Sequence, residues 1–172
     1  NTTASYNIAI GLQALEENTT GTKNIAIGQD ALDAADTESN NIAIGYDALG
    51  GAVAGGEYNI AIGNNALDAL TSGDSNIAVG HDALTAHTTG HRNLAIGIGA
   101  LDAADTENDN IAIGYDALGG AVAAGEFNVA IGNYSLDALT AGDYNVAVGD
   151  NTLSANTTGN YNTATGGWAL NK

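Results

Sequence analysis

The sequence predicts an all-β fold, a parallel β-solenoid of ten coils of about 17 residues, from three observations. A phrase of the form Asn-aliphatic-Ala-aliphatic-Gly recurs through the whole chain. Successive phrases are separated by 17 or 18 residues. The rest of each coil is rich in Gly, Asp, Asn, Thr and Ser, which are turn-forming residues. The phrase begins at Asn7, Asn24, Asn41, Asn59, Asn76, Asn93, Asn110, Asn128, Asn145 and Asn162.

Further positions in each coil are nearly invariant. The second residue after the Asn is always Ala, the fourth is always Gly and the eighth is always Leu. The first and third are Ile, Val or Leu, except in the last coil, where Thr163 and Thr165 take their place. The alternation predicts a short strand, and the Gly permits a sharp turn directly after it. Stacked coils then pair strand on strand.

The alternation also divides the side chains between two faces of each strand. The two aliphatic residues share one face, while the Asn and the Ala share the other. We expect the aliphatic pair and the Leu to form an inner core of about three large aliphatic side chains per coil. The Ala face is then expected to lie outside, where small side chains permit close approach by a neighbouring chain. The alternative is that each Ala fills a tight space within one chain.

The repeats extend over the whole chain, so residues 1–172 are predicted to form a single array, an excerpt of a longer fibre. Residues 1–6 are expected to be the end of a preceding coil, and residues 7–172 the ten coils. Residues 24–75 resemble residues 93–144, which indicates duplication of a four-coil block. A strand-plus-helix repeat is an alternative for the Ala-Leu segments. Against it, Gly interrupts every coil, and Gly-Gly-Ala-Val-Ala replaces the helix-prone segment in two coils.

The repeated Asn is expected to form a structural ladder. In-register amides hydrogen-bond along a stack of strands, as they do in cross-β assemblies. The alternative is a row of amides that binds a ligand. The predicted ladder residues are Asn24, Asn41, Asn59, Asn76, Asn93, Asn110, Asn128 and Asn145.

Charge and composition restrict the partners. The formal net charge is −17, from 20 acidic and 3 basic residues, so no nucleic acid is expected to bind. Binding to anionic lipid is disfavoured for the same reason. No apolar run approaches 18 residues, so no direct membrane insertion is expected. The acidity favours solubility, and an acidic face that collects divalent cations is the alternative.

No catalytic, cofactor or metal site is predicted, and the chain is not expected to be an enzyme. There is no Cys, and no Ser lies in a Gly-x-Ser-x-Gly motif. The carboxylates occupy turns of a thin solenoid, which are poor places to bury an acid–base pair. His81, His87 and His91 match no standard metal spacing and are expected to be exposed turn residues. Calcium binding by the Asp-rich turns is an alternative, although the calcium-roll repeat is absent.

The nine aromatic residues all lie beside the turns, outside the aliphatic positions. Rings near acidic and amide groups suit stacking on sugars, because a ring provides a large contact area at low entropic cost. The alternative is packing over neighbouring turns or between chains. The candidate receptor contacts are Tyr46, Tyr58, Tyr115, Phe127, Tyr134 and Tyr144.

The pattern N-x-A-x-G-x-x-A-L, followed by N-T-T-G-x-x-N, resembles two related groups of repeats. One is the YadA-like head repeat of bacterial trimeric autotransporter adhesins, and the other is the repeat region of bacteriophage tail-fibre proteins. The resemblance covers the whole chain and is closest over residues 145–162. It implies a left-handed β-roll with three chains side by side in a homotrimer. Adhesin heads tend to have shorter coils and a Ser after the Asn, which favours the phage group for this chain.

The expected function is structural and adhesive: a segment of a phage tail fibre or virion surface protein that mediates attachment to a host receptor. The expected partners are other copies of the chain and a host surface glycan or protein receptor. The expected location is the virion tail fibre or the extracellular bacterial surface. The alternatives are a bacterial trimeric autotransporter adhesin head and a monomeric ice-binding or calcium-binding β-solenoid. A flat ice-binding array favours Thr in each coil, whereas Thr-Thr pairs recur here only every fourth coil.

Overall fold

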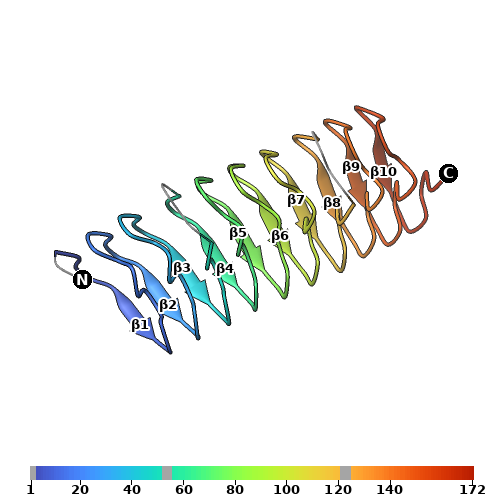
Figure 1. Ribbon diagram of the computed structural model, residues 1–172. Coiled ribbons are helices and arrows are strands. Elements are labelled where there is room, and N and C mark those ends of the chain that lie inside the picture. The colour runs from blue at the N-terminus through green and yellow to red at the C-terminus, as the bar shows by residue number, and fades with distance from the viewer. Residues whose placement is uncertain (1–2, 52–55, 121–124) are drawn as a thin grey trace.

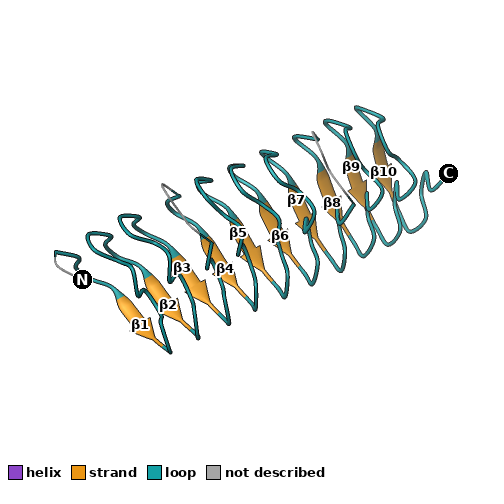
Figure 2. Ribbon diagram, in the orientation of Figure 1, coloured by secondary structure: helices purple, strands orange, loops and turns teal. Residues whose placement is uncertain are grey.

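The computed structural model describes residues 3–51, 56–120 and 125–172, which form a row of stacked coils (Figure 1). Each coil contributes one three-residue strand, and the strands lie together along one side of the rod, with turns and loops elsewhere (Figure 2). The strands are β1 (Ile8–Ile10), β2 (Ile25–Ile27), β3 (Ile42–Ile44), β4 (Ile60–Ile62), β5 (Ile77–Val79), β6 (Leu94–Ile96), β7 (Ile111–Ile113), β8 (Val129–Ile131), β9 (Val146–Val148) and β10 (Thr163–Thr165).

The ten strands form one sheet in chain order, and each neighbouring pair is parallel. Ala9 lies opposite Ala26, and Ala43 lies opposite Ala61 although that step is one residue longer. Equivalent side chains therefore stack along the rod at the strand spacing of about 4.8 Å. The predicted all-β parallel solenoid is confirmed. In the three described ranges no helix forms, so the strand-plus-helix alternative is wrong.

The two strand faces are arranged in the reverse of the expected way. The central Ala of each strand from β2 to β9 is fully buried, whereas the flanking aliphatic side chains are half-buried or exposed. The inner core consists of this Ala, the invariant Leu and mostly small neighbours. The expectation that the aliphatic pair lines the core is therefore wrong. The Asn and the Ala share one face of the strand. The Asn lies inside because its amide hydrogen-bonds to buried backbone groups, so the Ala lies inside with it and the aliphatic pair faces out.

The invariant Leu adopts a backbone conformation that is rare for a bulky residue. Leu84 has φ of 54°, in the left-handed region, and Asp82 and Arg92 in the same coil have φ of 55° and 59°. Such a conformation costs an L-residue about 1–2 kcal/mol. Full burial of a Leu side chain contributes roughly 1.5–3 kcal/mol, which offsets the strain at its own position. The next coil also stabilises this turn, because the Leu84 N–H donates to the Ala100 carbonyl of that coil over 3.1 Å.

The Gly that ends each strand from β1 to β9 is required by close contact between coils. Gly63 has φ of +139°, and a Cβ placed there would lie 2.2 Å from the carbonyl oxygen of Gly80 in the next coil. That distance is far below van der Waals contact, and the obstacle is rigid backbone. Only Gly fits this position.

A second inward position, eleven residues after the Asn, is filled in two different ways. Where it is Ala, as at Ala104, the residue three positions later is a buried Glu, Glu107. Where it is larger, as at Leu70, the later residue is Gly73, and a Cβ there would lie 2.9 Å from the Leu70 Cδ1 atom. The two positions therefore share one interior volume, which is filled either by a larger residue at the first position (Leu, His or Asn) or by a Glu at the second.

Candidate interaction surface

The outward side chains of the strands form a continuous two-column apolar surface along the rod, which we call the outer strand face. Its members alternate with the buried Ala, so each strand contributes two of them. One column is Ile8, Ile25, Ile42, Ile60, Ile77, Leu94, Ile111, Val129, Val146 and Thr163. The other is Ile10, Ile27, Ile44, Ile62, Val79, Ile96, Ile113, Ile131, Val148 and Thr165.

The outer strand face is large and carries no charge. Ten strands at about 4.8 Å and three residues at about 3.3 Å give an area of about 450 Å². The largest apolar patch on an ordinary monomer spans about 300–600 Å² and often has a function. Although the chain has a net charge of −17, both columns contain only aliphatic residues and, in β10, Thr. Depletion of charge is the compositional mark of the centre of an interface.

The Asn ladder lies inside the rod and holds the coils in register. The Asn59 N–H donates to the Asn41 Oδ1 atom over 2.8 Å, and Asn59 Nδ2 donates to the Gly73 carbonyl over 2.8 Å. Asn59 Oδ1 in turn accepts from the Asn76 N–H over 2.9 Å. All eight predicted ladder residues are buried. Since these amides bond within the chain, they form no exposed row for a ligand.

Direct contact between amides is less common than contact between amide and backbone. Asn93 Nδ2 lies 3.2 Å from Asn76 Oδ1, and Asn145 Nδ2 lies 3.1 Å from Asn128 Oδ1. In most coils the amide oxygen accepts a backbone N–H of the next coil, and the amide nitrogen donates to a turn carbonyl. The ladder therefore ties each strand both to the start of the next strand and to a turn of its own coil.

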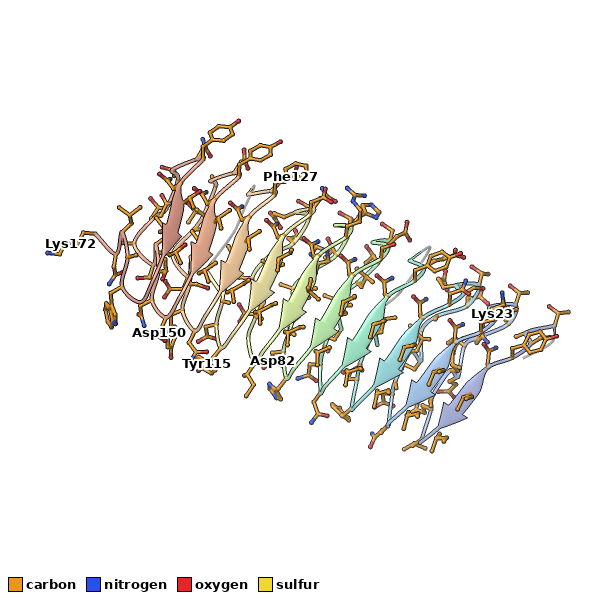
Figure 3. All side chains as sticks on the ribbon, turned by 180° about the vertical axis from the view of Figure 1, so that it is seen from behind. Lys23, Asp82, Tyr115, Phe127, Asp150 and Lys172 are labelled. Carbon is orange, nitrogen blue, oxygen red and sulfur yellow. The ribbon has the colours of Figure 1, made fainter. Side chains whose placement is uncertain are left out.

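Aromatic side chains border the outer strand face at both ends of the strands. Phe127 and Tyr144 stack in parallel with ring centroids 4.9 Å apart, and Tyr144 stacks on Tyr161 at 5.2 Å. Tyr115 and Tyr134 meet edge to face at 5.3 Å. Figure 3 shows Phe127 at one end of the strands and Tyr115 at the other. These are the contacts expected when in-register rings pack over neighbouring turns.

The six candidate receptor contacts are all exposed. The stacked geometry of one column decides which parts of its rings are open to contact. Tyr144 lies between the rings of Phe127 and Tyr161, so its faces are covered and its edge and hydroxyl are what solvent meets. Stacking of a sugar on a ring face needs an open face, which this column offers only at its ends.

A row of carboxylates follows the turn after the strands. From the third to the eighth coil, an Asp two positions before the Leu alternates with an Asp directly after it, and the second coil carries both. Burial raises the pKa of Asp68, and the neighbouring charges of Asp47 and Asp82 raise it further. Burial likewise raises the pKa of Asp102, with a further contribution from Asp116. Figure 3 labels Asp82 on this edge of the rod.

The three His residues have separate surroundings. His81 Nδ1 lies 2.7 Å from the Asp82 carboxylate, and His91 Nδ1 accepts the Asp74 N–H over 2.9 Å. His87 is fully buried, so the expectation of an exposed turn residue is wrong there. A signal was present in the sequence, because His87 occupies the same coil position as the buried Leu70. Among the described residues, no group of three or more His, Asp or Glu side chains is placed to hold a metal ion.

Two hollows lie beside the last coil. One, of about 270 Å³, is lined by residues that include Leu153, Thr157 and Leu170. The other, of about 570 Å³, is lined by Trp168, Leu170, Asn171 and Lys172. Both lie at the end of the rod, away from the middle coils. In the part of the chain that the structure describes, no helix has the length and apolar character needed to span a membrane.

Comparison of the chain with protein-family models, with curated proteins and with solved structures gave no match. The outer strand face and its aromatic borders are therefore interpreted from their own geometry and chemistry.

Proposed function

We propose that this chain is a structural and adhesive segment of an elongated surface fibre, in a phage tail fibre or virion surface protein that attaches to a host receptor. Three copies lie side by side, each a left-handed β-roll, with their outer strand faces toward the common axis. The observation that carries this proposal is the uncharged two-column apolar face that runs the length of a strongly acidic rod.

The outer strand face suits contact with another copy of itself. It is aliphatic in nine of its ten strands, so a partner of matching length and regularity buries it best, and a second rod has both. No carboxylate lies on the strands, so the contact brings no like charges face to face within it. A closed ring of three such rods leaves the acidic turns in solvent.

The rod itself supplies the mechanical part of the function. Ten coils at about 4.8 Å give a length of about 45–50 Å, and each coil is tied to the next by backbone and Asn hydrogen bonds. A rigid spacer of this kind holds exposed groups at fixed separations. Three chains then present each weak contact three times, which raises avidity without any new contact.

Native mass in solution tests the association. We expect a mass of three chains by sedimentation equilibrium or native mass spectrometry. The double variant Ile62→Thr/Ile96→Thr should dissociate at least tenfold more readily, while its far-ultraviolet circular dichroism stays unchanged. Thr already occupies both outward positions of β10, so the strand tolerates it. A wild-type chain that stays single at the highest soluble concentration would overturn the trimer.

Receptor contact is tested separately with the rings. We expect the wild-type chain to bind a subset of a panel of bacterial surface polysaccharides. Tyr46→Ala/Tyr58→Ala and Tyr115→Ala/Tyr134→Ala variants would show which pair of rings makes the contact. If the wild type binds a polysaccharide and both double variants bind it equally well, these four rings are not the contact.

A bacterial trimeric adhesin head shares this geometry and is the second candidate from the sequence resemblance. The monomeric alternatives find less support. An ice-binding face of regularly spaced Thr would need hydroxyls on the flat strands, and nine of the ten strands present aliphatic side chains there.

A further inference from the structure

The turn of the fifth coil differs in one buried residue from its counterparts in the first and ninth coils. Residues 18–21 and 156–159 read Asn-Thr-Thr-Gly, whereas residues 87–90 read His-Thr-Thr-Gly. The Asn side chain ties its own turn: Asn18 Nδ2 donates to the Gly21 carbonyl over 3.2 Å, and Asn156 Nδ2 donates to the Gly159 carbonyl over 3.1 Å. In the fifth coil an imidazole occupies this place.

The imidazole of His87 is enclosed, and one of its nitrogens meets a ladder amide. Its Nε2 lies 3.2 Å from the Asn93 Nδ2 atom, which also donates to the Glu107 carbonyl over 2.8 Å. The two Asn93 Nδ2 hydrogens are shared among Nε2, the Glu107 carbonyl and Asn76 Oδ1, which is also 3.2 Å away. An amide nitrogen does not accept, so the tautomer that suits this contact has Nε2 as the acceptor and its proton on Nδ1. The Nδ1 atom is buried without a partner. Protonation would add a donor at the nitrogen that faces another donor.

The ring packs directly against the backbone of its own turn. A Cβ at Gly90 would lie 2.2 Å from the His87 Cε1 atom, so the ring lies directly against that backbone. Burial lowers the pKa of His87, and the nearby His91 lowers it further. Contact with the Gly90 and Ala104 backbone and the negative charge of Asp105 raise the pKa, but they offset the effect of burial only in part.

The charged groups around this turn are partnered, except for one oxygen of Glu107. The Asp105 carboxylate accepts the Thr88 hydroxyl, and the Glu107 Oε2 atom accepts the N–H groups of Asp105 and Thr106 over 2.7 and 2.9 Å. The Glu107 Oε1 atom is buried and makes no hydrogen bond, to His87 or to any other group that the structure describes. On the side of the preceding coil, Asp74 faces His91, with 3.7 Å between its carboxylate and the Nδ1 atom.

Arg92 pairs with Asp109 at the surface, with 2.7 Å between Nε and Oδ1. The Asp102 carboxylate of the next coil belongs to the acidic row after the strands, and its pKa is raised. A protonated His87 would therefore be a buried cation without a hydrogen-bonded carboxylate.

We propose that His87 makes the fifth coil an acid-sensitive joint, in which protonation of the buried imidazole opens the turn over residues 85–92 and loosens the rod between β4 and β6. Each coil of a solenoid contacts only its neighbours, so one turn opens without unfolding the distant coils. The chain is stiff at neutral pH and acquires a hinge near its middle in mild acid.

The direction of the pH effect follows from linkage. The closed turn holds His87 neutral, with a pKa below the ordinary value of about 6.5, whereas the open turn releases it to that value. Above about pH 6.5 both forms are neutral, so the closed turn has its full stability. As pH falls below that value the open form gains a proton and the closed form does not, so stability is lost.

The row of raised Asp pKa values acts in the opposite sense, because those carboxylates are relieved as they are protonated. A comparison of the wild type with a His87 variant at each pH removes this contribution, since both chains carry the same carboxylates.

Hydrogen exchange on the whole chain tests the joint. After correction for intrinsic exchange rates, we expect the opening equilibrium of residues 84–93 to rise between pH 7.5 and pH 5.0 by about five- to thirtyfold. The counterpart segment, residues 153–162, should change little. His87→Asn, which restores the Asn-Thr-Thr-Gly turn, should remove the rise. His87→Leu, which copies Leu70 and Leu139 at the same coil position, gives a second variant if the first folds poorly.

Controls separate His87 from the other two imidazoles. His81→Asn and His91→Asn copy residues that other coils carry at those positions, Asn64 and Asn108, and should keep the acid response. An equal response in the wild type and in both His87 variants would overturn the proposal. A nuclear magnetic resonance titration that gave His87 its ordinary pKa in the folded rod would overturn it as well. Neither result depends on whether the rods associate.

Discussion

The inner and outer faces of the same strands follow different rules. On the inner face, every strand has Ala at its centre and an Asn directly before it, and the Ala is fully buried in β2 to β9. On the outer face, Ile, Leu, Val and Thr replace one another from coil to coil. The inner side chains meet the next coil and a turn at fixed distances, so only one shape fits. The outer side chains meet no part of their own chain that demands a shape.

This difference suggests that two kinds of constraint act on adjacent residues. The inner face is constrained by volume and by hydrogen bonds, as in any close-packed interior. The outer face is uncharged and aliphatic in nine of the ten strands, but its side chains vary, so folding of the coil does not demand one shape there. Substitutions on the two faces should therefore have effects of very different size on folding.

The largest effect is expected where backbone packs on backbone. Gly80 has φ of +146°, and a Cβ there would lie 2.2 Å from the carbonyl oxygen of Gly97. We expect Gly80→Ala to break the pairing of β5 with β6 and to lower the free energy of unfolding by more than about 4 kcal/mol. Thermal unfolding followed by circular dichroism measures this.

Gly99→Asn is the matched control, because other coils carry Asn65 and Asn151 at that position with similar positive φ. A Gly80→Ala chain as stable as this control would show that the close contact between coils is not needed.

The Asn ladder should give the next largest effect. Asn76→Ala removes the acceptor of the Asn93 N–H and the donor to the Gly90 carbonyl, both buried. Unsatisfied buried groups cost about 1–3 kcal/mol each, so we expect a loss of about 2–4 kcal/mol in chemical denaturation. Ser75→Ala, one residue earlier, should change stability by less than about 0.5 kcal/mol. Equal losses in the two variants would count against the ladder.

A smaller effect is expected at the shared turn volume, and it should be non-additive. Ala104→Leu alone should crowd the Glu107 side chain, and Glu107→Gly alone should leave a void. Each is expected to cost about 1–3 kcal/mol. The double variant copies the Leu70–Gly73 pair and should recover at least half of the summed loss. A double-mutant cycle measures the coupling, and strict additivity would show that the two positions do not share a volume.

The smallest effect on folding is expected on the outer strand face. Ile77→Thr removes little buried area within one chain, because Ile77 is exposed. We expect a change of less than about 1 kcal/mol in the free energy of unfolding of the single chain, measured by denaturation at low protein concentration. A loss as large as that of Asn76→Ala would mean that the outer face supports the coil itself.

Much of the fold was predictable from the repeat. The constant step between Asn residues requires parallel strands in register, and the Gly after each strand marks the turn. The inward position of the aliphatic pair was predicted wrongly, because hydrophobicity alone favours burying Ile over burying Asn. The burial of Glu107 was also missed. The Glu107 side chain fits inside because the small Ala104, three residues earlier, leaves space for it, and only the folded chain shows that the two positions share that space.

The sequence by itself determined the period, the number of strands, their parallel register and the residues that lie in turns, because a regular chemical repeat has few ways to stack. Only the tertiary structure decided which strand face lies inside. The alternation of side chains along a strand places Asn and Ala on one face and the aliphatic residues on the other, but it does not say which of the two faces is buried. The choice comes from the narrow coil, in which the Asn amide satisfies the buried N–H of the next coil and a turn carbonyl, while Leu and Ala fill the remaining volume. The aliphatic columns therefore lie on the outside of the rod.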